Sequence, residues 1–323
     1  MPNSVSVTVP ARLHLGFLDM EGGLGRRFGS LGLSIEVPVT RLTMSVSRTP
    51  GVRGPDQERA TRYLAALEEA LRLPRYCHQV QIESAIPSHA GLGSGTQMAL
   101  ALAAALRRLH GLPLDIRGDA ARLGRGARSG IGIGLFETGG FVVDGGRSEA
   151  SGPPPIIAQH RFPEEWGIIL VLDDQLKGAH GQEETEAFLD LPPFAAKTAA
   201  TICRLLLMQV LPAVVERDLA RFGTGISEIQ GLLGDYFAPI QGGRFTSPDV
   251  ARAIEHLAAA GGTGVGQSSW GPTGFAFAPS LEAAAHMADA LRMQPFATDL
   301  DIRVVKASNR KASITVAETC PTD

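Results

Sequence analysis

Pro87-Ser88-His89-Ala90-Gly91-Leu92-Gly93-Ser94-Gly95-Thr96-Gln97 is the stretch of sequence that decides the fold. Residues 80–86 before it have the pattern of a strand. Residues 98–109 after it are rich in Ala and Leu and predict a helix that ends before Gly111. A glycine loop between a strand and a helix N-terminus holds phosphate, because free backbone N–H groups and the positive end of the helix dipole face the anion. The sequence therefore predicts a site for a phosphorylated small molecule.

This loop differs from the two best-known phosphate loops. It lacks the Gly-Lys-Ser/Thr ending of a P-loop, and Gly91, Gly93 and Gly95 are spaced Gly-x-Gly-x-Gly instead of Gly-x-Gly-x-x-Gly. Glycine motifs discriminate loosely, so a turn that merely packs tightly against its helix is the structural alternative.

Composition narrows the class of protein. The chain has 323 residues, 44% of them hydrophobic, which is enough for a sizeable core and for two domains or one large one. A net charge of -3 does not indicate a nucleic acid or an anionic membrane as partner. We expect no signal peptide and no membrane span, since the apolar run 98–106 is too short to cross a bilayer. Three widely separated cysteines in no metal spacing favour reduced thiols in the cytoplasm.

Helices and strands are mixed in both halves of the chain, which favours an α+β fold. The Pro-rich segment 151–155 is the best linker candidate, so we predict domains at 1–155 and 156–323. The sequence predicts strands at 5–9, 13–18, 39–46, 141–143, 166–172 and 273–278, helices at 56–73, 194–210 and 281–292, loops at 22–32 and 264–272, and a closing hairpin of 302–305 with 314–316.

Two acids, Asp173 and Asp174, follow the apolar strand 166–172. They superficially resemble the ribose-binding motif of ordinary phosphoribosyltransferases, but no Thr-Gly-rich loop follows, so their role is left open. The polar, glycine-punctuated segment 177–184 belongs to the class of loops that carry function, and a lid is one interpretation of it.

Three motifs resemble those of the GHMP kinase superfamily. Residues 87–97 resemble its central motif Pro-x-x-x-Gly-Leu-Gly-Ser-Ser, 10–19 resemble its N-terminal motif, and 264–274 lie where its third glycine motif belongs. Their order and separation fit over nearly the whole chain. The resemblance implies a two-domain fold, with an N-terminal half like ribosomal protein S5 domain 2 and a ferredoxin-like C-terminal half.

One branch of the superfamily is more similar. The strings at 12–15, 91–97, 128–132, 139–146 and 266–273 are similar to those of the β-ribofuranosylaminobenzene 5′-phosphate synthase family. That resemblance implies an enzyme that joins 5-phosphoribosyl-1-diphosphate to 4-hydroxybenzoate or 4-aminobenzoate and releases CO2 and diphosphate. It implies Mg2+ as cofactor, a role in tetrahydromethanopterin biosynthesis and one-carbon metabolism, and a cytoplasmic homodimer. Which of the two benzoates is used stays open.

The alternatives are a small-molecule kinase that uses ATP and an inactive regulator that only binds a ligand. Kinases of this superfamily often carry Ser-Gly-Ile-Asp with the Asp as base, whereas this chain has Gly132 at that position. A catalytic base is typically worth about 10²–10⁴-fold in rate, so its absence disfavours the kinase. The polar strings around Arg12, Ser129 and Gln267 disfavour the inactive regulator.

The synthase reaction fits the absence of a base at the reacting carbon, because CO2 leaves it instead of a proton. The site must supply donors and Mg2+ for the diphosphate, and cations for the 5′-phosphate and the carboxylate. Arg12, Arg26 and Arg128 offer guanidinium groups for this purpose, with a solvated surface arginine as the alternative.

The remaining candidates follow from the same need. His14 is assigned to the substrate or the diphosphate, with a structural histidine as alternative; Asp19 and Glu137 are the acids for Mg2+ or ribose; Trp270 is expected to stack on the benzoate unless it is a core residue. We also predict that Gln267, Ser268 and Trp270 lie beside the glycine loop. The predicted set is therefore Arg12, His14, Asp19 and Arg128 for catalysis, Glu137 for metal, and Gly91, Gly93, Ser94, Gly95, Thr96, Gln97, Ser129, Gly130, Gln267, Ser268 and Trp270 for substrate and phosphate.

Overall fold

The computed structural model describes residues 3–75, 77–148, 152–176 and 191–317. The segment 177–184, interpreted above as a lid, and Cys320 lie outside the described residues.

A seven-stranded sheet forms the N-terminal part of the molecule. Its strands run in the order β11-β1-β2-β4-β3, with β5 paired to β2 and β6 paired to β5. Val5, Val7 and Val9 alternate inward with no exposed surface, as expected for a strand with one face on the core. The strands are β1 (Ser4–Asp19), β2 (Phe28–Val46), β3 (Gly51–Arg53), β4 (His78–Ser84), β5 (Phe141–Asp144), β6 (Ile156–His160) and β11 (Ser313–Ala317).

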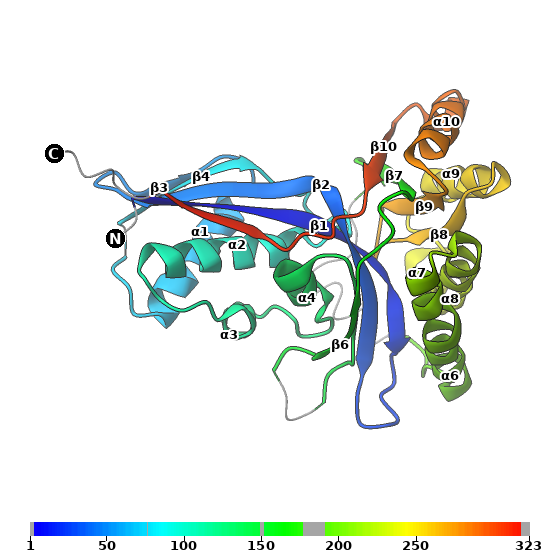
Figure 1. Cartoon of the computed structure of the whole chain (residues 1–323), viewed down its shortest axis with the longest axis horizontal. Helices are drawn as coiled ribbons and strands as arrows, with labels where there is room; N and C mark the ends of the chain where they lie inside the picture. Colours follow the sequence, from blue (N-terminus) through cyan, green and yellow to red (C-terminus); the bar gives the residue numbers. More distant parts are fainter. Residues whose placement is uncertain (1–2, 76, 149–151, 177–190, 318–323) are drawn as a thin grey trace.

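Four helices cover one face of this sheet (Figure 1). Helix α2 is buried along most of its length, which explains its Ala- and Leu-rich sequence. It begins directly at the glycine loop, so the loop is anchored by the most buried helix of this half. The helices are α1 (Gln57–Ala70), α2 (Ser94–Leu109), α3 (Ile116–Arg122) and α4 (Ile131–Thr138).

A four-stranded antiparallel sheet, in the order β10-β7-β9-β8, forms the C-terminal part. Along the chain, helices connect β7 to β8 and β9 to β10, which is the ferredoxin-like arrangement that the resemblance implied. The strands are β7 (Gly167–Asp173), β8 (Thr263–Gln267), β9 (Gly274–Ala278) and β10 (Leu300–Lys306). The helical segments are α6 (Ala196–Leu205), η1 (Leu206–Val210), α7 (Leu211–Glu216), α8 (Leu219–Gln241), α9 (Pro248–Ala259), α10 (Leu281–Arg292) and η2 (Pro295–Ala297).

Strand β7 explains the continuous apolar run seen in the sequence. Ile168 and Leu170 pack in the core shared with β1 and α8, while Ile169 and Val171 face α9 and α10. A strand covered on both faces reads as a near-continuous hydrophobic stretch. The α+β fold predicted from the sequence is confirmed.

Several predicted elements are wrong. Residues 302–305 and 314–316 do not form a hairpin, because β10 pairs with β7 and β11 pairs with β1 in the other sheet. The loops predicted at 22–32 and 264–272 are shorter, since β2 begins at Phe28 and β8 ends at Gln267. The helical run continues beyond the helix predicted at 194–210, because Pro212 lies in the first turn of α7, where its missing N–H costs little.

The sheets do not divide at residue 155. Strand β6 hydrogen-bonds to β5 and so belongs to the seven-stranded sheet, and β11 returns to that sheet at the end of the described chain. One hydrophobic core joins the two parts, with Phe141, Phe162 and Phe222 in contact at ring-centroid separations of 5.3–6.4 Å. The candidate site lies along this junction.

Candidate active site

The glycine loop has a backbone that other residues would not tolerate. Gly91 and Gly93 have φ angles of 75° and 82°, in the left-handed region that favours glycine. A Cβ on Gly91 would lie 2.1 Å from the Ser268 carbonyl oxygen, and one on Gly93 would lie 2.9 Å from Cγ of Arg12. The glycines therefore allow both a tight turn and close approach of two distant segments.

Three guanidinium groups surround the first turn of α2. Arg12 donates to the Gly91 carbonyl at 2.6 Å, and Arg59 donates to Ser94 Oγ at 3.2 Å. An ideal Cβ on Gly95 would lie 3.3 Å from an Arg125 nitrogen and 3.5 Å from an Arg59 nitrogen. The first turn itself carries no acidic residue. A helix N-terminus ringed by arginines is suited to a phosphate or diphosphate.

Arg59 and Arg125 were not among the residues predicted for the site. Helix α1 brings Arg59 and Tyr63, one turn apart, against the N-terminus of α2, and Arg125 donates to the Tyr63 hydroxyl from the loop before α4. The i,i+4 spacing of Arg59 and Tyr63 was visible in the sequence, but nothing local indicated that this face of α1 meets the glycine loop.

The third motif meets the glycine loop directly. Ser268 Oγ donates to the Gly91 carbonyl at 2.7 Å and accepts the His14 backbone N–H at 2.9 Å. Thr273 Oγ1 donates to the Ala90 carbonyl at 2.6 Å. The predicted contact between segments more than 170 residues apart is thus confirmed for Ser268, which joins the glycine loop to β1.

A cavity of about 30 Å³ is lined by Gln267, Ser269 and Trp270, the neighbours of Ser268 in the chain. Two aromatic pairs stand in its wall: Trp270 with Phe237, at 4.8 Å between ring centroids, and His14 with Phe17, at 4.4 Å. Space of this size holds one or two water molecules. An aromatic substrate can enter only if these rings move apart.

His14 is a neutral, buried residue in this wall, with 2% of its surface exposed. Burial, together with the nearby Arg12 charge, holds the pKa of its imidazole well below the usual value. Its Nε2 atom is buried and has no hydrogen-bond partner among the residues that the structure describes.

Two predicted substrate-binding amides are turned inward instead. Gln267 Oε1 accepts the Thr246 N–H at 2.7 Å, and its Nε2 donates to Gln241 and to the Ser269 carbonyl. Gln97 is 1% exposed and its Nε2 donates to the Gly132 carbonyl at 3.2 Å. Both side chains hold the framework here, and Gln267 also lines the cavity.

Ser129 and Gly130 belong to a buried network around Asp144, a residue the sequence did not single out. The Asp144 carboxylate accepts Ser30 Oγ at 2.5 Å, the Gly130 N–H at 2.8 Å and the Gly146 N–H at 2.9 Å. Burial raises its pKa against the effect of these donors. This network fixes the N-terminus of α4, and Arg128 lies half-buried in the loop directly before it.

Gly132 lets α4 approach α2 closely. A Cβ there would lie 3.0 Å from Cγ2 of Thr96, so a carboxylate side chain would press on the first turn of α2. The position that holds a base in many kinases of the superfamily is therefore occupied by a packing contact here.

The structure does not bring Asp19, Glu137 or Arg26 to this cluster. Asp19 Oδ1 accepts two backbone N–H groups in the turn after β1, seven extended residues or roughly 23 Å along the strand from Arg12. Arg26 donates to the carbonyls of Gly145 and Gly146 at 2.6 and 2.7 Å.

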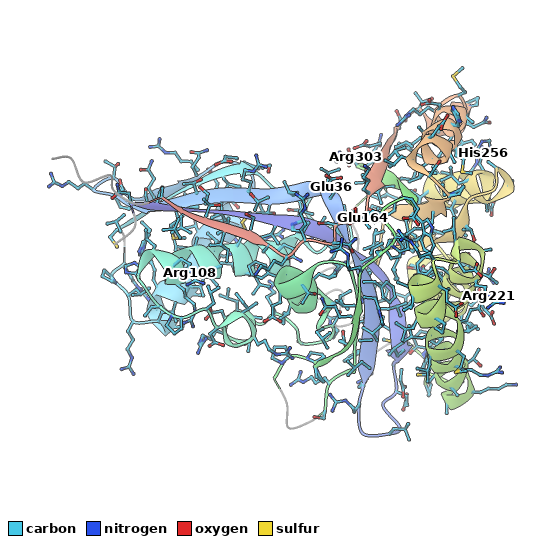
Figure 2. All side chains as sticks on the ribbon, viewed as in Figure 1. Glu36, Arg108, Glu164, Arg221, His256 and Arg303 are labelled. Carbon is cyan, nitrogen blue, oxygen red and sulfur yellow. The ribbon has the colours of Figure 1, made fainter. Side chains whose placement is uncertain are left out.

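Glu137 lies at the far end of α4, in a separate open cavity with Arg108 and Lys311. Burial raises its pKa, with Arg117 opposing the shift. Arg108, labelled in Figure 2, lies with α2 and α3 beneath the sheet. Among the described residues no group of three or more His, Cys, Asp or Glu is arranged to hold a metal ion.

Asp173 also has a structural use. Its Oδ2 accepts Ser247 Oγ at 2.7 Å, and Ser247 in turn caps α9 through the Val250 N–H. The acid therefore ties the end of β7 to the start of α9.

Comparison with known proteins identifies relatives of this chain. The N-terminal and C-terminal GHMP kinase domain models match residues 58–140 and 210–294. The chain is 32% identical to the beta-ribofuranosylphenol 5′-phosphate synthase of Methanothermobacter thermautotrophicus, over 82% of this chain and 86% of that protein. The synthase of the same name from Archaeoglobus fulgidus is 37% identical, over 69% and 74% of the two chains.

Solved structures agree on the fold. The mevalonate kinase of L. major superposes with a TM-score of 0.71 at 14% identity, covering 94% of this chain and 96% of that one. Homoserine kinase from Cytophaga hutchinsonii gives 0.68 at 18% identity, covering 98% of each chain. At these identities the likeness concerns the fold alone.

Proposed function

This chain belongs to the beta-ribofuranosylphenol 5′-phosphate synthase family within the GHMP kinase superfamily, and we propose that it is a decarboxylating phosphoribosyltransferase of tetrahydromethanopterin biosynthesis. The observation that carries the proposal, beside family membership, is the arginine-ringed N-terminus of α2 joined through Ser268 to an aromatic cavity. One part suits a diphosphate and the other an aromatic acid.

The reaction joins 5-phosphoribosyl-1-diphosphate to a 4-substituted benzoate. The bond from ribose C1 to the diphosphate oxygen breaks, and its electron pair leaves with the diphosphate. The ring carbon that bears the carboxylate forms the new bond to C1. CO2 then leaves that carbon, and the electron pair of the broken bond restores the aromatic ring.

The described residues supply what this sequence of steps needs. Backbone N–H groups at Ser94 and Gly95, with Arg59 and Arg125, stabilise the leaving diphosphate. Arg12 lies between the glycine loop and His14, where it can meet charge on either substrate. Trp270 and its neighbours receive the aromatic ring.

We propose that Mg2+ binds together with the substrate, held mainly by the diphosphate. Mg2+ in phosphoryl sites is commonly held by substrate phosphates, one or two carboxylates and waters. The residues described around the glycine loop do not form a carboxylate cluster, and Asp19 and Glu137 lie elsewhere, so these side chains alone do not fit a resident magnesium site. When bound with the diphosphate, the ion supplies charge neutralisation.

The names of the relatives favour one acceptor. They describe a ribofuranosylphenol, and a phenol product requires a hydroxybenzoate substrate. We therefore propose 4-hydroxybenzoate over 4-aminobenzoate.

The kinase alternative lacks a base at the expected place. Gly132 packs against Thr96, and the buried Asp144 is already engaged by three donors. The Aeropyrum pernix mevalonate kinase matches less well than the synthases, at 25% identity over 48% of this chain.

The homodimer is proposed from an exposed apolar face. The continuous helical run α6–η1–α7 exposes Leu207, Met208 and Val215 by 64%, 70% and 62%. Antiparallel pairing of this run with the same run of a second subunit would cover these side chains in a self-complementary interface. Leu207→Glu should then give monomers in sedimentation velocity; a variant that sediments like the wild type would contradict this interface.

The same run, Ala196–Glu216, is long and apolar enough to cross a membrane, with 33% of its most apolar window buried. A single such helix is weak evidence for a span, and its buried side packs into the main core. Cys77 and Cys203 are free thiols, which suits a reducing compartment. We therefore propose a cytoplasmic enzyme that is not membrane-bound.

The proposed function is tested by offering both donor substrates. The purified chain is incubated with Mg2+ and 4-hydroxybenzoate, and with either ATP or 5-phosphoribosyl-1-diphosphate. We expect diphosphate only with the phosphoribosyl donor and no ADP with ATP. ADP formation coupled to a phosphorylated product would support the kinase instead.

A further inference from the structure

The cavity wall beside the glycine loop contains a buried ring nitrogen that the fold does not use. Nε2 of His14 has no hydrogen-bond partner among the described residues, although only 2% of the residue is exposed to solvent. Buried polar atoms in folded proteins nearly always have a partner. An orphaned acceptor or donor in a cavity wall indicates that a bound molecule supplies the partner.

The amides of the same wall are already used within the protein. Gln230 donates to the Leu15 carbonyl at 2.9 Å and accepts the Gln267 N–H at 2.8 Å. Gln241 donates to the Arg244 carbonyl and accepts from Gln267. These contacts leave the imidazole nitrogen of His14 as a buried polar atom available to a ligand.

The charges that face His14 keep it neutral before substrate binds. Arg12 lies two residues away on β1, and Arg244, paired with Asp235 at 2.5 Å, lines the cavity. Burial and the Arg12 charge lower the pKa of His14. A diphosphate bound near Arg12 would offset that positive charge, so His14 becomes a better proton acceptor once the phosphoribosyl donor is in place.

We propose that Nε2 of His14 takes the proton of the acceptor's para-hydroxyl group while the opposite ring carbon attacks ribose C1. This inference rests on the proposed function and adds to it the base and the reason for a phenol substrate. The base acts on oxygen, at the far side of the ring from the reacting carbon.

The step balances without an added reagent. The O–H electron pair becomes a C=O bond, the ring's π electrons form the bond to C1, and the diphosphate departs with the C–O pair. The resulting cyclohexadienone loses CO2, the electrons of that bond restore the ring, and the oxygen recovers its proton from His14. An aromatic amine releases its proton far less readily, so this device favours the hydroxybenzoate.

The test compares acceptors whose phenols differ in acidity. Wild type and His14→Gln are assayed with 4-hydroxybenzoate and with 3,5-difluoro-4-hydroxybenzoate, which is already ionised at neutral pH. We expect His14→Gln to lower kcat by about 10²–10⁴-fold with the parent acid. The deficit should shrink at least tenfold with the difluoro acid, because no proton then has to be removed. Effects of fluorine on ring reactivity cancel in the ratio of wild type to variant.

Phe17→Leu is the matched control, because it disturbs the ring that contacts His14 and leaves the nitrogen in place. Its deficit should be the same for both acids. If His14→Gln does not fold, His14→Asn replaces it. A His14 deficit that is equal for the two acids would overturn this inference alone, whereas absence of CO2 from the wild type would overturn the proposed function and this inference with it.

Discussion

Replacing Ser268 by alanine should weaken the molecule at the junction of its two halves. Ser268 Oγ accepts the His14 N–H at 2.9 Å and donates to the Gly91 carbonyl at 2.7 Å, and the side chain is fully buried. Without the hydroxyl, the Gly91 carbonyl still receives Arg12, but the His14 N–H loses the acceptor that the structure gives it. An orphaned buried donor costs about 1–3 kcal/mol.

The chain offers a control of identical chemistry. Ser34 is also fully buried, but its Oγ has no hydrogen-bond partner among the described residues. Ser34→Ala removes an unsatisfied polar atom and should be neutral or slightly stabilising. Urea unfolding of both variants gives the free energies of unfolding. Ser268→Ala that is no less stable than Ser34→Ala would refute the assignment of Ser268 as the tie between loop and strand.

Three further outcomes follow from the site. Arg59→Ala and Arg125→Ala should each weaken binding of 5-phosphoribosyl-1-diphosphate in calorimetry by about tenfold or more, equivalent to about 1.4 kcal/mol; unchanged affinity would remove them from the diphosphate site. Gly132→Asp should not create ATP phosphorylation, because the new carboxylate is crowded by α2; ADP formation by this variant would contradict that. Burial lowers the pKa of His14 and also of His110, which lies beside His78 at the C-terminal end of α2, so the unfolded chain binds more protons than the folded one. The free energy of unfolding should therefore fall as the pH drops below about 6.5. Urea midpoints at pH 7.5 and 5.5 measure this, and equal midpoints would contradict it.

The sequence predicts local features of this protein well. The strand, glycine loop and helix at 80–109 are confirmed because turn residues, apolar periodicity and helix ends are all encoded within a few residues. Ser247 likewise caps α9 through a local contact, since its Oγ accepts the Val250 N–H. The approach of the segment around Ser268 to the glycine loop is confirmed as well; it was expected because two glycine-rich polar loops from the two halves of a chain often line one cleft.

The failures depend on tertiary structure. Strands β10 and β11 have hairpin spacing in the sequence, but each finds its partner in a different sheet. A motif fixes the place of Gln97 and Gln267 and says nothing of side-chain direction, and both amides turn into the framework. Arg125 was missed because it reaches α2 only through the packing of α1 and the loop before α4.

The most direct test of phosphoribosyl transfer with decarboxylation is to count its two small products. The wild-type chain is given 5-phosphoribosyl-1-diphosphate, Mg2+ and 4-hydroxybenzoate labelled in the carboxyl carbon, without ATP. Equal amounts of labelled CO2 and diphosphate, with a product in which ribose C1 is bonded to ring carbon, are expected. Diphosphate release with the label still in the aromatic acid would contradict the central claim.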